Sequence, residues 1–165
     1  MTTMKKEKDP SPLKTIIKQA RELVKIPIVI GVLVTPVRFS LELLGLPENT
    51  IFIIGVLWVT IGYAIWWGVK YYDHDFFPGL LLMSLLIFSP VSRISVALAW
   101  WVETKWALGT HYGLYFNTFG EALWNQVVYG TLVQLIPGFL AGCITWGVML
   151  KIKTWNVNKN TVKNG

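Results

Sequence analysis

Four long apolar stretches occupy most of this 165-residue chain, and they constrain its fold more than any other feature of the sequence. The stretches cover residues 26–46, 51–69, 76–102 and 127–150. A helix needs roughly 20 apolar residues to cross the hydrocarbon core of a bilayer, and each stretch is close to or above that length. The sequence therefore predicts an all-α membrane protein, a bundle of four transmembrane helices within residues 26–150.

The composition favours the same fold class. Hydrophobic residues make up 53% of the chain and charged residues only 15%, which is too little polar surface to cover a soluble globule of this size. The single cysteine, Cys143, falls inside the last apolar stretch, so no disulfide within the chain is expected.

The positive charges predict how the chain is oriented in the membrane. Twelve of the fifteen Lys and Arg residues precede the first stretch or follow the second or the fourth, whereas the connections at residues 47–50 and 103–126 hold only Lys105. Because cytoplasmic segments carry the excess of Lys and Arg, we expect both termini in the cytoplasm. The basic residues are not set among stacking aromatic side chains, so nucleic acid is not an expected partner.

The segment before the first span has a helical pattern of its own. In residues 11–25, apolar residues recur three or four positions apart, while Lys14, Lys18, Arg21 and Lys25 take the other face. This pattern predicts a basic amphipathic helix on the membrane surface, near anionic headgroups. The alternative is a helix whose apolar stripe packs on the bundle itself.

Both ends of the chain are polar. Residues 1–10 are expected to be disordered in the cytoplasm and do not resemble a cleaved export signal. The cytoplasmic tail at residues 151–165 is rich in Asn and Lys, and from residue 154 onward we expect it to lack regular structure because it has little apolar surface to bury.

Two short sequences recur in the same order. Residues 35–40 (TPVRFS) resemble residues 89–95 (SPVSRIS), and residues 65–70 (IWWGVK) resemble residues 144–148 (ITWGV). If the similarity is genuine, the spans form two parallel two-helix repeats related by an axis along the membrane normal. Chance similarity is the alternative, because these residue types are common in membrane helices.

Two arginines inside the predicted spans, Arg38 and Arg93, are the candidate ligand-binding residues. A charge in hydrocarbon is costly, so such a residue usually faces the interior of the bundle. Each arginine follows a proline, Pro36 or Pro90, which removes a backbone hydrogen bond and loosens the helix at that depth. A guanidinium fork beside freed amide groups suits an anionic ligand.

A purely structural role for the arginines is the alternative. Glu42 lies one turn after Arg38 and is placed to neutralise it on the same helix face. Arg93 has no carboxylate three or four residues away, so its expected partners are Glu42 across the bundle, Glu103, or headgroups reached by snorkelling. Pairing and anion binding both stay open, and Arg93 is the better functional candidate.

Small residues and prolines predict how the spans pack. Gly138 and Gly142 form a small-xxx-small face in the fourth span, which suits close helix packing within the chain, with self-association as the alternative. Gly55 and Gly62 are expected to serve the second span likewise. Kinks are expected at the three prolines inside the spans, Pro36, Pro90 and Pro137.

The connection at residues 103–126 holds the candidates for catalysis. Its aromatic character predicts a position on the membrane surface, and Thr118 with Glu121 has the spacing of a capping box that starts a helix near Phe119. That helix would continue, bent near residue 130 or 137, into the fourth span. As an enzyme, the chain would use His111 as a general base oriented by Glu103 or Glu121. No nucleophile motif accompanies these residues.

Metals and cofactors are not expected. The two histidines, His74 and His111, fall in connections on opposite sides of the membrane, so they cannot hold one haem or metal ion together.

Three functions therefore remain candidates. The first is a non-catalytic membrane component or accessory subunit, favoured because no complete active site is visible. The second is a small oligomeric transporter or channel that selects an anionic solute with Arg38 and Arg93. The third is a lipid-directed enzyme that uses residues 103–126. The expected partners are the lipid bilayer with its anionic headgroups, and a membrane protein or a second copy of the chain.

Overall fold

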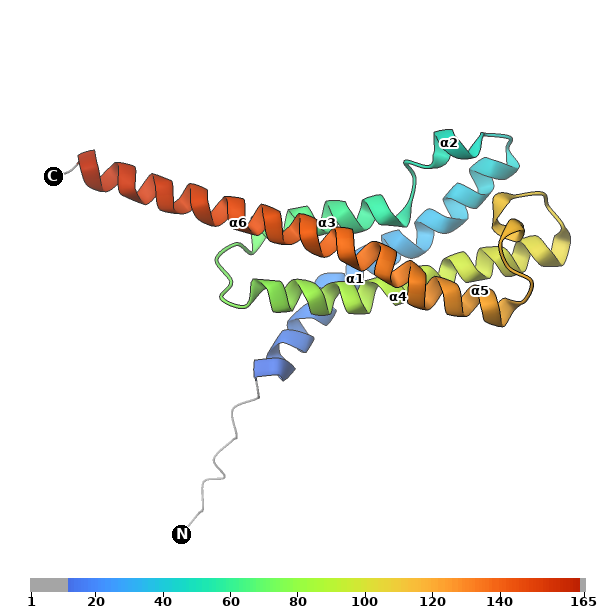
Figure 1. The fold of residues 1–165 in the computed structure, drawn as a ribbon, viewed down its shortest axis with the longest axis horizontal. Helices are drawn as coiled ribbons and strands as arrows, with labels where there is room; N and C mark the ends of the chain where they lie inside the picture. Colours follow the sequence, from blue (N-terminus) through green and yellow to red (C-terminus); the bar gives the residue numbers. More distant parts are fainter. Residues whose placement is uncertain (1–11, 164–165) are drawn as a thin grey trace, which may run out of the picture.

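The computed structural model describes residues 12–163, and within that range the chain is helical with no strand. Four long helices are joined by short helical turns (Figure 1). The elements in chain order are α1 (Pro12–Leu43), α2 (Glu48–Ile51), α3 (Val56–Lys70), α4 (Phe77–Trp106), a 3₁₀ turn η1 (His111–Leu114), α5 (Phe119–Asn125), a π-helical turn η2 (Gln126–Gly130) and α6 (Thr131–Lys163).

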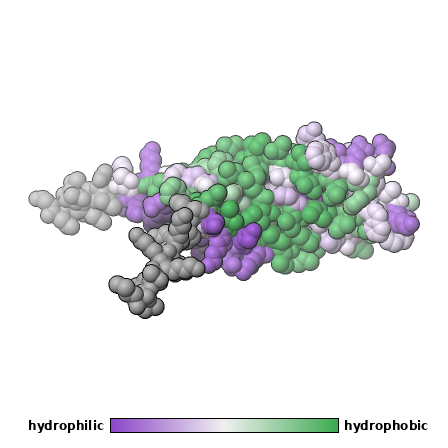
Figure 2. Space-filling view, turned by 90° about the horizontal axis from the view of Figure 1, so that it is seen from below, coloured by the Kyte–Doolittle hydropathy of each residue, from purple (hydrophilic) through white to green (hydrophobic). Residues whose placement is uncertain are grey.

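Four helical segments are long and apolar enough to cross a membrane, as the sequence predicted. They are Leu13–Leu43, Glu48–Lys70, Phe77–Trp106 and Phe119–Asn156. Figure 2 shows apolar surface around the middle of the molecule and polar residues toward its two ends. The predicted all-α fold with four helical segments long and apolar enough to cross a membrane is confirmed.

The bundle is built from two helix pairs. The most extensive contacts join α1 to α4 and α3 to α6, and α4 also packs on α6 (Figure 1). The α3–α4 loop, which follows Lys70, marks one end of the bundle, here named the Lys70 end. The opposite end, with α2 and η1, is named the His111 end. The predicted repeat would make the members of each pair equivalent, and it stays a prediction.

The predicted amphipathic segment at residues 11–25 is not a separate helix where the structure describes it. From Pro12 onward they belong to the continuous helix α1, because the buried positions follow one helical stripe into the predicted span without a change of phase. Those buried residues are Ala20, Val24, Pro27, Gly31 and Thr35. Ala20 and Val24 are buried and Val24 joins the main core, whereas Leu13 is 56% exposed, so the second half of the stripe packs on the bundle. The position of the segment on a membrane surface stays a prediction.

The second predicted span, residues 51–69, is interrupted. After the short helix α2, the chain leaves helical geometry and α3 begins only at Val56, with Gly55 in an extended conformation at φ −133°. Fifteen residues of helix rise about 22 Å, less than the roughly 30 Å of a bilayer core. Apolar composition predicted the correct segment here but not its continuity.

The C-terminal part of the chain is more helical than predicted. Helix α6 continues to Lys163 instead of ending at residue 150, so the tail is not without regular structure, and Figure 1 shows it projecting beyond the other helices. The prediction for residues 1–10 lies outside the described residues.

The helix start predicted near Phe119 is confirmed. The Thr118 hydroxyl accepts a hydrogen bond from the Glu121 N–H at 3.2 Å, and the Glu121 carboxylate accepts one from the Asn117 N–H at 3.1 Å. The π-helical turn η2 then follows directly, where a bend was expected near Gly130. The three prolines lie inside continuous helices, Pro36 in α1, Pro90 in α4 and Pro137 in α6, and the predicted kinks stay predictions.

Close packing between α3 and α6 depends on glycine, as predicted for Gly138 and Gly142. A Cβ atom on Gly142 would lie 3.1 Å from the Ala64 carbonyl oxygen of α3, and 2.5 Å from Leu81 of the neighbouring helix α4. One on Gly68 would lie 2.8 Å from the Gly142 carbonyl oxygen. Only a residue without a side chain lets the two backbones approach this closely.

The other two glycines do not serve close packing within the bundle, which was the expected use, whereas self-association stays a prediction. Gly62 faces away from the interface, with nothing within 4 Å of a Cβ placed there, and Gly55 precedes α3 instead of packing within it. Thr60, Ala64 and Gly68 form the packing face of α3 in their place.

Candidate functional site

Both candidate arginines line one cavity near the His111 end of the bundle. The cavity has a volume of about 290 Å³ and is bounded by α1, α4, the start of α3 and the segments between α4 and α6. Arg38 reaches it from α1 and Arg93 from α4. Both arginines therefore face the same cavity, and their predicted convergence on one anionic group stays a prediction. The cavity's other lining residues with polar groups include Thr35, His111, Tyr112, Tyr115 and Gln126.

Arg93 has few protein partners. Its Nη1 donates to the Oε1 of Gln126 at 3.3 Å, and its Nε is buried without a hydrogen-bond partner. No carboxylate among the described residues lies within 4.0 Å of its guanidinium, so neither Glu42 nor Glu103 neutralises it as expected. A guanidinium carries five N–H donors, so this side chain keeps donors for a ligand.

Arg38 pairs with Glu48 and not with Glu42. Its Nη2 lies 3.6 Å from the Glu48 Oε1, and its Nε is buried without a partner. The Arg38 side chain is 17% exposed, whereas Glu48 is 51% exposed, so the pair is held at the surface end of the cavity. A long and half-exposed ion pair of this kind holds Arg38 only weakly.

The end of α1 explains how Glu48 reaches Arg38. The Gly45 N–H bonds to the Glu42 carbonyl at 2.9 Å and the Leu46 N–H to the Leu41 carbonyl at 3.2 Å, which is the Schellman arrangement that ends a helix. Gly45 has φ +87°, a conformation that glycine adopts without strain. The chain therefore reverses at once, and Pro47 leads into α2 beside α1.

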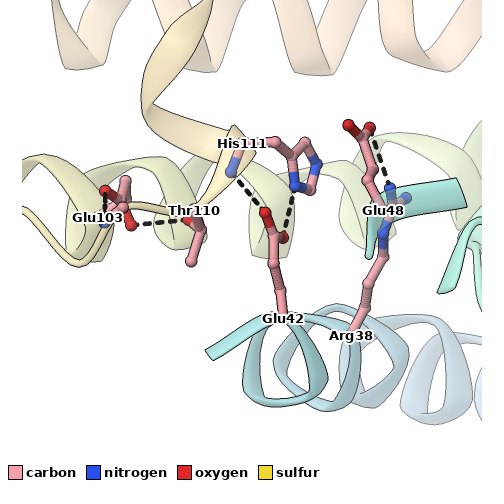
Figure 3. A network of polar contacts seen from close by, with 7 residues as sticks. Arg38, Glu42, Glu48, Glu103, Thr110 and His111 are labelled. Atoms are coloured by element: carbon pink, nitrogen blue, oxygen red, sulfur yellow. Dashed lines mark hydrogen bonds and ion pairs between the residues drawn. The ribbon is translucent and has the colours of Figure 1, made fainter. Parts of the chain in front are cut away.

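Glu42 instead holds His111. Its Oε1 accepts from the His111 backbone N–H at 2.6 Å, and its Oε2 lies 2.6 Å from His111 Nδ1 (Figure 3). Both side chains are largely buried, at 13% and 15% exposed. The two contacts fasten the connection between α4 and α5 to the end of α1, and so place His111 and Tyr112 at the cavity.

Glu103 and Glu121 have structural partners of their own. Glu103 accepts hydrogen bonds from the Gly109 N–H and the Thr110 hydroxyl, both at 2.7 Å, and so folds the chain after α4 back on itself (Figure 3). Glu121 caps α5. The catalytic arrangement expected from the sequence, with Glu103 or Glu121 orienting His111, is therefore wrong, because Glu42 takes that position.

The walls of the cavity are mostly apolar and aromatic. Val96 and Trp100 contribute from α4, and Phe116 from the connection that follows it. Gly130 leaves room for Arg93, since a Cβ atom there would lie 3.0 Å from the Arg93 Cδ. A hydrogen bond of 2.9 Å from the Ser95 hydroxyl to the Thr35 hydroxyl ties α1 to α4 beside the cavity.

The start of α3 adds to the positive character of the site. No side chain caps this helix, and its first residues, Val56 and Leu57, line the cavity. The N-terminal end of a helix carries a partial positive charge. Tyr112, outside the four long segments, is also buried at the cavity, and this burial raises its pKa to about 12. Its hydroxyl therefore stays protonated at neutral pH.

The histidines lie at opposite ends, as predicted. His74 shares a hydrogen bond of 3.3 Å with Gln19 near the start of α1, whereas His111 meets Glu42 near its end. Twenty-three residues of helix separate these partners, or about 35 Å. Within the part of the chain that the structure describes, no three His, Cys, Asp or Glu side chains gather as metal ligands would.

Sequence reasoning missed several cavity residues. Gln126 and Thr35 carry no pattern that distinguishes them from other polar residues in apolar segments, and the break before α3 was hidden by its apolar composition. No protein-family model matches this chain, and no match was found among curated proteins or solved structures.

Proposed function

We propose that this chain is an integral membrane protein with four spans whose cavity binds an anionic ligand through Arg38 and Arg93. The observation that carries the proposal is that two arginines from different helices line one cavity while only Arg38 has a carboxylate partner, 3.6 Å away. Positive charge gathered in a largely apolar site is costly unless an opposite charge compensates it. An anionic ligand supplies that compensation.

The distribution of apolar and charged residues supports the membrane part of the proposal. The four long helices expose apolar side chains along their middle, and polar residues gather at the ends of the molecule (Figure 2). Lys70 and Lys153 lie at the Lys70 end, where Lys153 forms an ion pair with Asp73. The positive-inside rule then puts the Lys70 end and both termini in the cytoplasm and the cavity toward the opposite leaflet.

The packing toward the Lys70 end favours a binding component over a pore through one copy of the bundle. Trp67, Phe77 and Leu81 fill the space between the helices there, and each is only 1% exposed. A continuous aqueous path would require this core to open. A membrane component or accessory subunit that holds an anion agrees best with this arrangement, and transport would require a second conformation.

The proposal is tested by ligand-induced stabilisation of the purified protein in detergent. Inorganic phosphate, added against a chloride control of equal ionic strength, is expected to raise the unfolding temperature, because a ligand that binds only the folded state stabilises it. Arg93→Gln should abolish this effect. Arg21→Gln is the matched control, since Arg21 is an exposed arginine on α1 outside the cavity.

Two results would contradict the proposal. One is equal stabilisation of the wild type and Arg93→Gln, which would place the bound anion elsewhere. The other is no stabilisation of the wild type by phosphate, sulfate or a carboxylate such as benzoate. Arg93→Lys accompanies these variants, because it keeps the charge if Arg93→Gln fails to fold, and it is expected to retain only part of the effect.

A further inference from the structure

We infer that the ligand of this cavity is an anionic amphiphile with a small phosphate monoester head, of which phosphatidic acid is the simplest example. The inference rests on the proposed anion site and adds the chemical class of its occupant. The head would lie between Arg38 and Arg93, and the acyl chains would remain in the surrounding bilayer. Three features of the cavity lead to this assignment: its rim, its walls and its size.

The rim of the cavity is continuous with the outer apolar surface of the bundle. Phe52, Trp58 and Val133 line the cavity, and they are also 53%, 47% and 57% exposed. These three residues, here named the rim, come from the break between α2 and α3, from α3 and from α6. In a membrane their exposed faces meet acyl chains, so the rim joins the charged interior of the cavity to hydrocarbon.

The shortness of α3 explains why the cavity opens on this side. The helix starts only at Val56, and residues 52–55 before it form a non-helical turn. Toward the His111 end, α1 and α6 therefore lack a full helix between them. A lipid that enters from the side of the bundle meets Phe52 and Trp58 before its head reaches the arginines.

The apolar walls favour an amphiphile over a free inorganic ion. Val96, Trp100 and Phe116 cannot replace the hydrogen bonds that a fully hydrated phosphate would lose on entering the cavity. A ligand whose first carbons pack against these side chains buries apolar surface as well, which is favourable. Its head still finds the two guanidinium groups and the Gln126 amide.

Size and charge select a phosphate monoester head. A cavity of about 290 Å³ is at the small end of ligand pockets, which favours a compact head. A phosphate monoester carries a charge of about −1.5 to −2 at neutral pH, whereas a diester carries one charge. Two guanidinium forks match the doubly charged head better, because each fork can bind two oxygen atoms.

The test compares lipids with identical acyl chains on the purified full chain by native mass spectrometry. Phosphatidic acid is expected to bind about tenfold or more tightly than phosphatidylglycerol, and Arg93→Gln should remove at least that factor. Trp58→Ala, which removes an apolar contact at the rim, should weaken the binding of phosphatidic acid. Arg21→Gln should not change this binding, which distinguishes the cavity from adsorption of lipid on the basic start of α1.

The outcomes separate this inference from the proposed function. Equal affinity for the two lipids, together with Arg93-dependent stabilisation by inorganic phosphate, would overturn the amphiphile and leave the anion site intact. Loss of Arg93 dependence for both ligands would overturn both. For each variant, the helical content and the size-exclusion elution volume in detergent are measured in parallel, to show that a lost signal is not a folding defect. Arg93→Lys replaces Arg93→Gln if the latter fails to fold.

Discussion

Glu42 on α1 holds both the backbone N–H and the side chain of His111, and each of these contacts is 2.6 Å long. A single carboxylate thereby fastens the connection between α4 and α5 over the cavity. The two residues are 69 positions apart in the chain, so the contact stabilises a long loop whose closure costs conformational entropy.

Breaking this contact is expected to destabilise the protein. Glu42→Ala leaves the His111 donors without an acceptor in a largely buried place, which costs about 1 to 3 kcal/mol. A double-mutant cycle with His111→Ala, measured by unfolding in detergent, should give a coupling energy of at least about 0.5 kcal/mol. Glu22→Ala is the control, since Glu22 forms an exposed pair on the same helix. Additive effects of the two mutations would show that the contact contributes nothing.

The α3–α6 interface is expected to tolerate no side chain at Gly142. Gly142→Ala would place a methyl group 3.1 Å from the Ala64 carbonyl oxygen on α3 and 2.5 Å from Leu81 on α4, and relieving these contacts should cost about 1 to 3 kcal/mol. Gly62→Ala, where the space is open, should be neutral or stabilising by up to about 1 kcal/mol. Unfolding titrations of the two variants check this, and equal effects would argue against close packing of the two helices.

A carboxylate at position 126 is expected to act as a built-in competitor for the ligand. Gln126→Glu would place a negative charge beside the Arg93 guanidinium, where Gln126 now accepts at 3.3 Å. Stabilisation by inorganic phosphate should then require about tenfold more phosphate, or disappear. Asn125→Asp adds the same charge one residue earlier, outside the cavity lining, and should have a smaller effect. Equal effects of both variants would indicate only a general change in charge.

Stability should fall at high pH because of Tyr112. Burial raises the pKa of Tyr112 from 10.0 to about 12. The contribution of the protonated Tyr112 to the free energy of unfolding is therefore complete below pH 10, and it is lost as the pH rises toward 12. The loss attributable to this group is up to about 2 to 3 kcal/mol. The free energy of unfolding, measured across this range, should decline less steeply with pH in Tyr112→Phe than in the wild type. In a spectrophotometric titration, the variant should also lack the tyrosine that ionises at the highest pH. An identical decline in both proteins would contradict the assignment.

Labelling of single cysteines should reveal the orientation in the membrane. In a Cys143→Ser background, Leu114→Cys, at a position 76% exposed in η1, is expected to react with an impermeant maleimide on intact cells. Asp75→Cys, in the α3–α4 loop, should react only after permeabilisation. The reverse pattern would invert the proposed topology, and reaction of both on intact cells would contradict four spans.

The outline of the fold was predictable because each of its signals is local. A long apolar run indicates a spanning helix whatever it packs on, and the Thr118–Glu121 spacing indicates a helix start because both partners lie within one turn. Gly138 and Gly142 were recognised for the same reason. The partner of Arg38 was not predicted correctly, because Glu42 is nearer to it in the sequence. The Schellman turn at Gly45 reverses the chain and brings Glu48 beside Arg38 instead.

The sequence by itself determined which segments are apolar and which are polar, how many long apolar segments there are, and that two of them contain an arginine. These properties are local, because hydropathy and helical periodicity depend on neighbouring residues. Only the tertiary structure decided that Arg38 and Arg93 line one cavity, that Glu42 holds His111, and that α3 starts late enough to leave the cavity open at its side. These relationships join residues tens of positions apart, and their geometry depends on how helices pack and where turns end them, which no local pattern encodes.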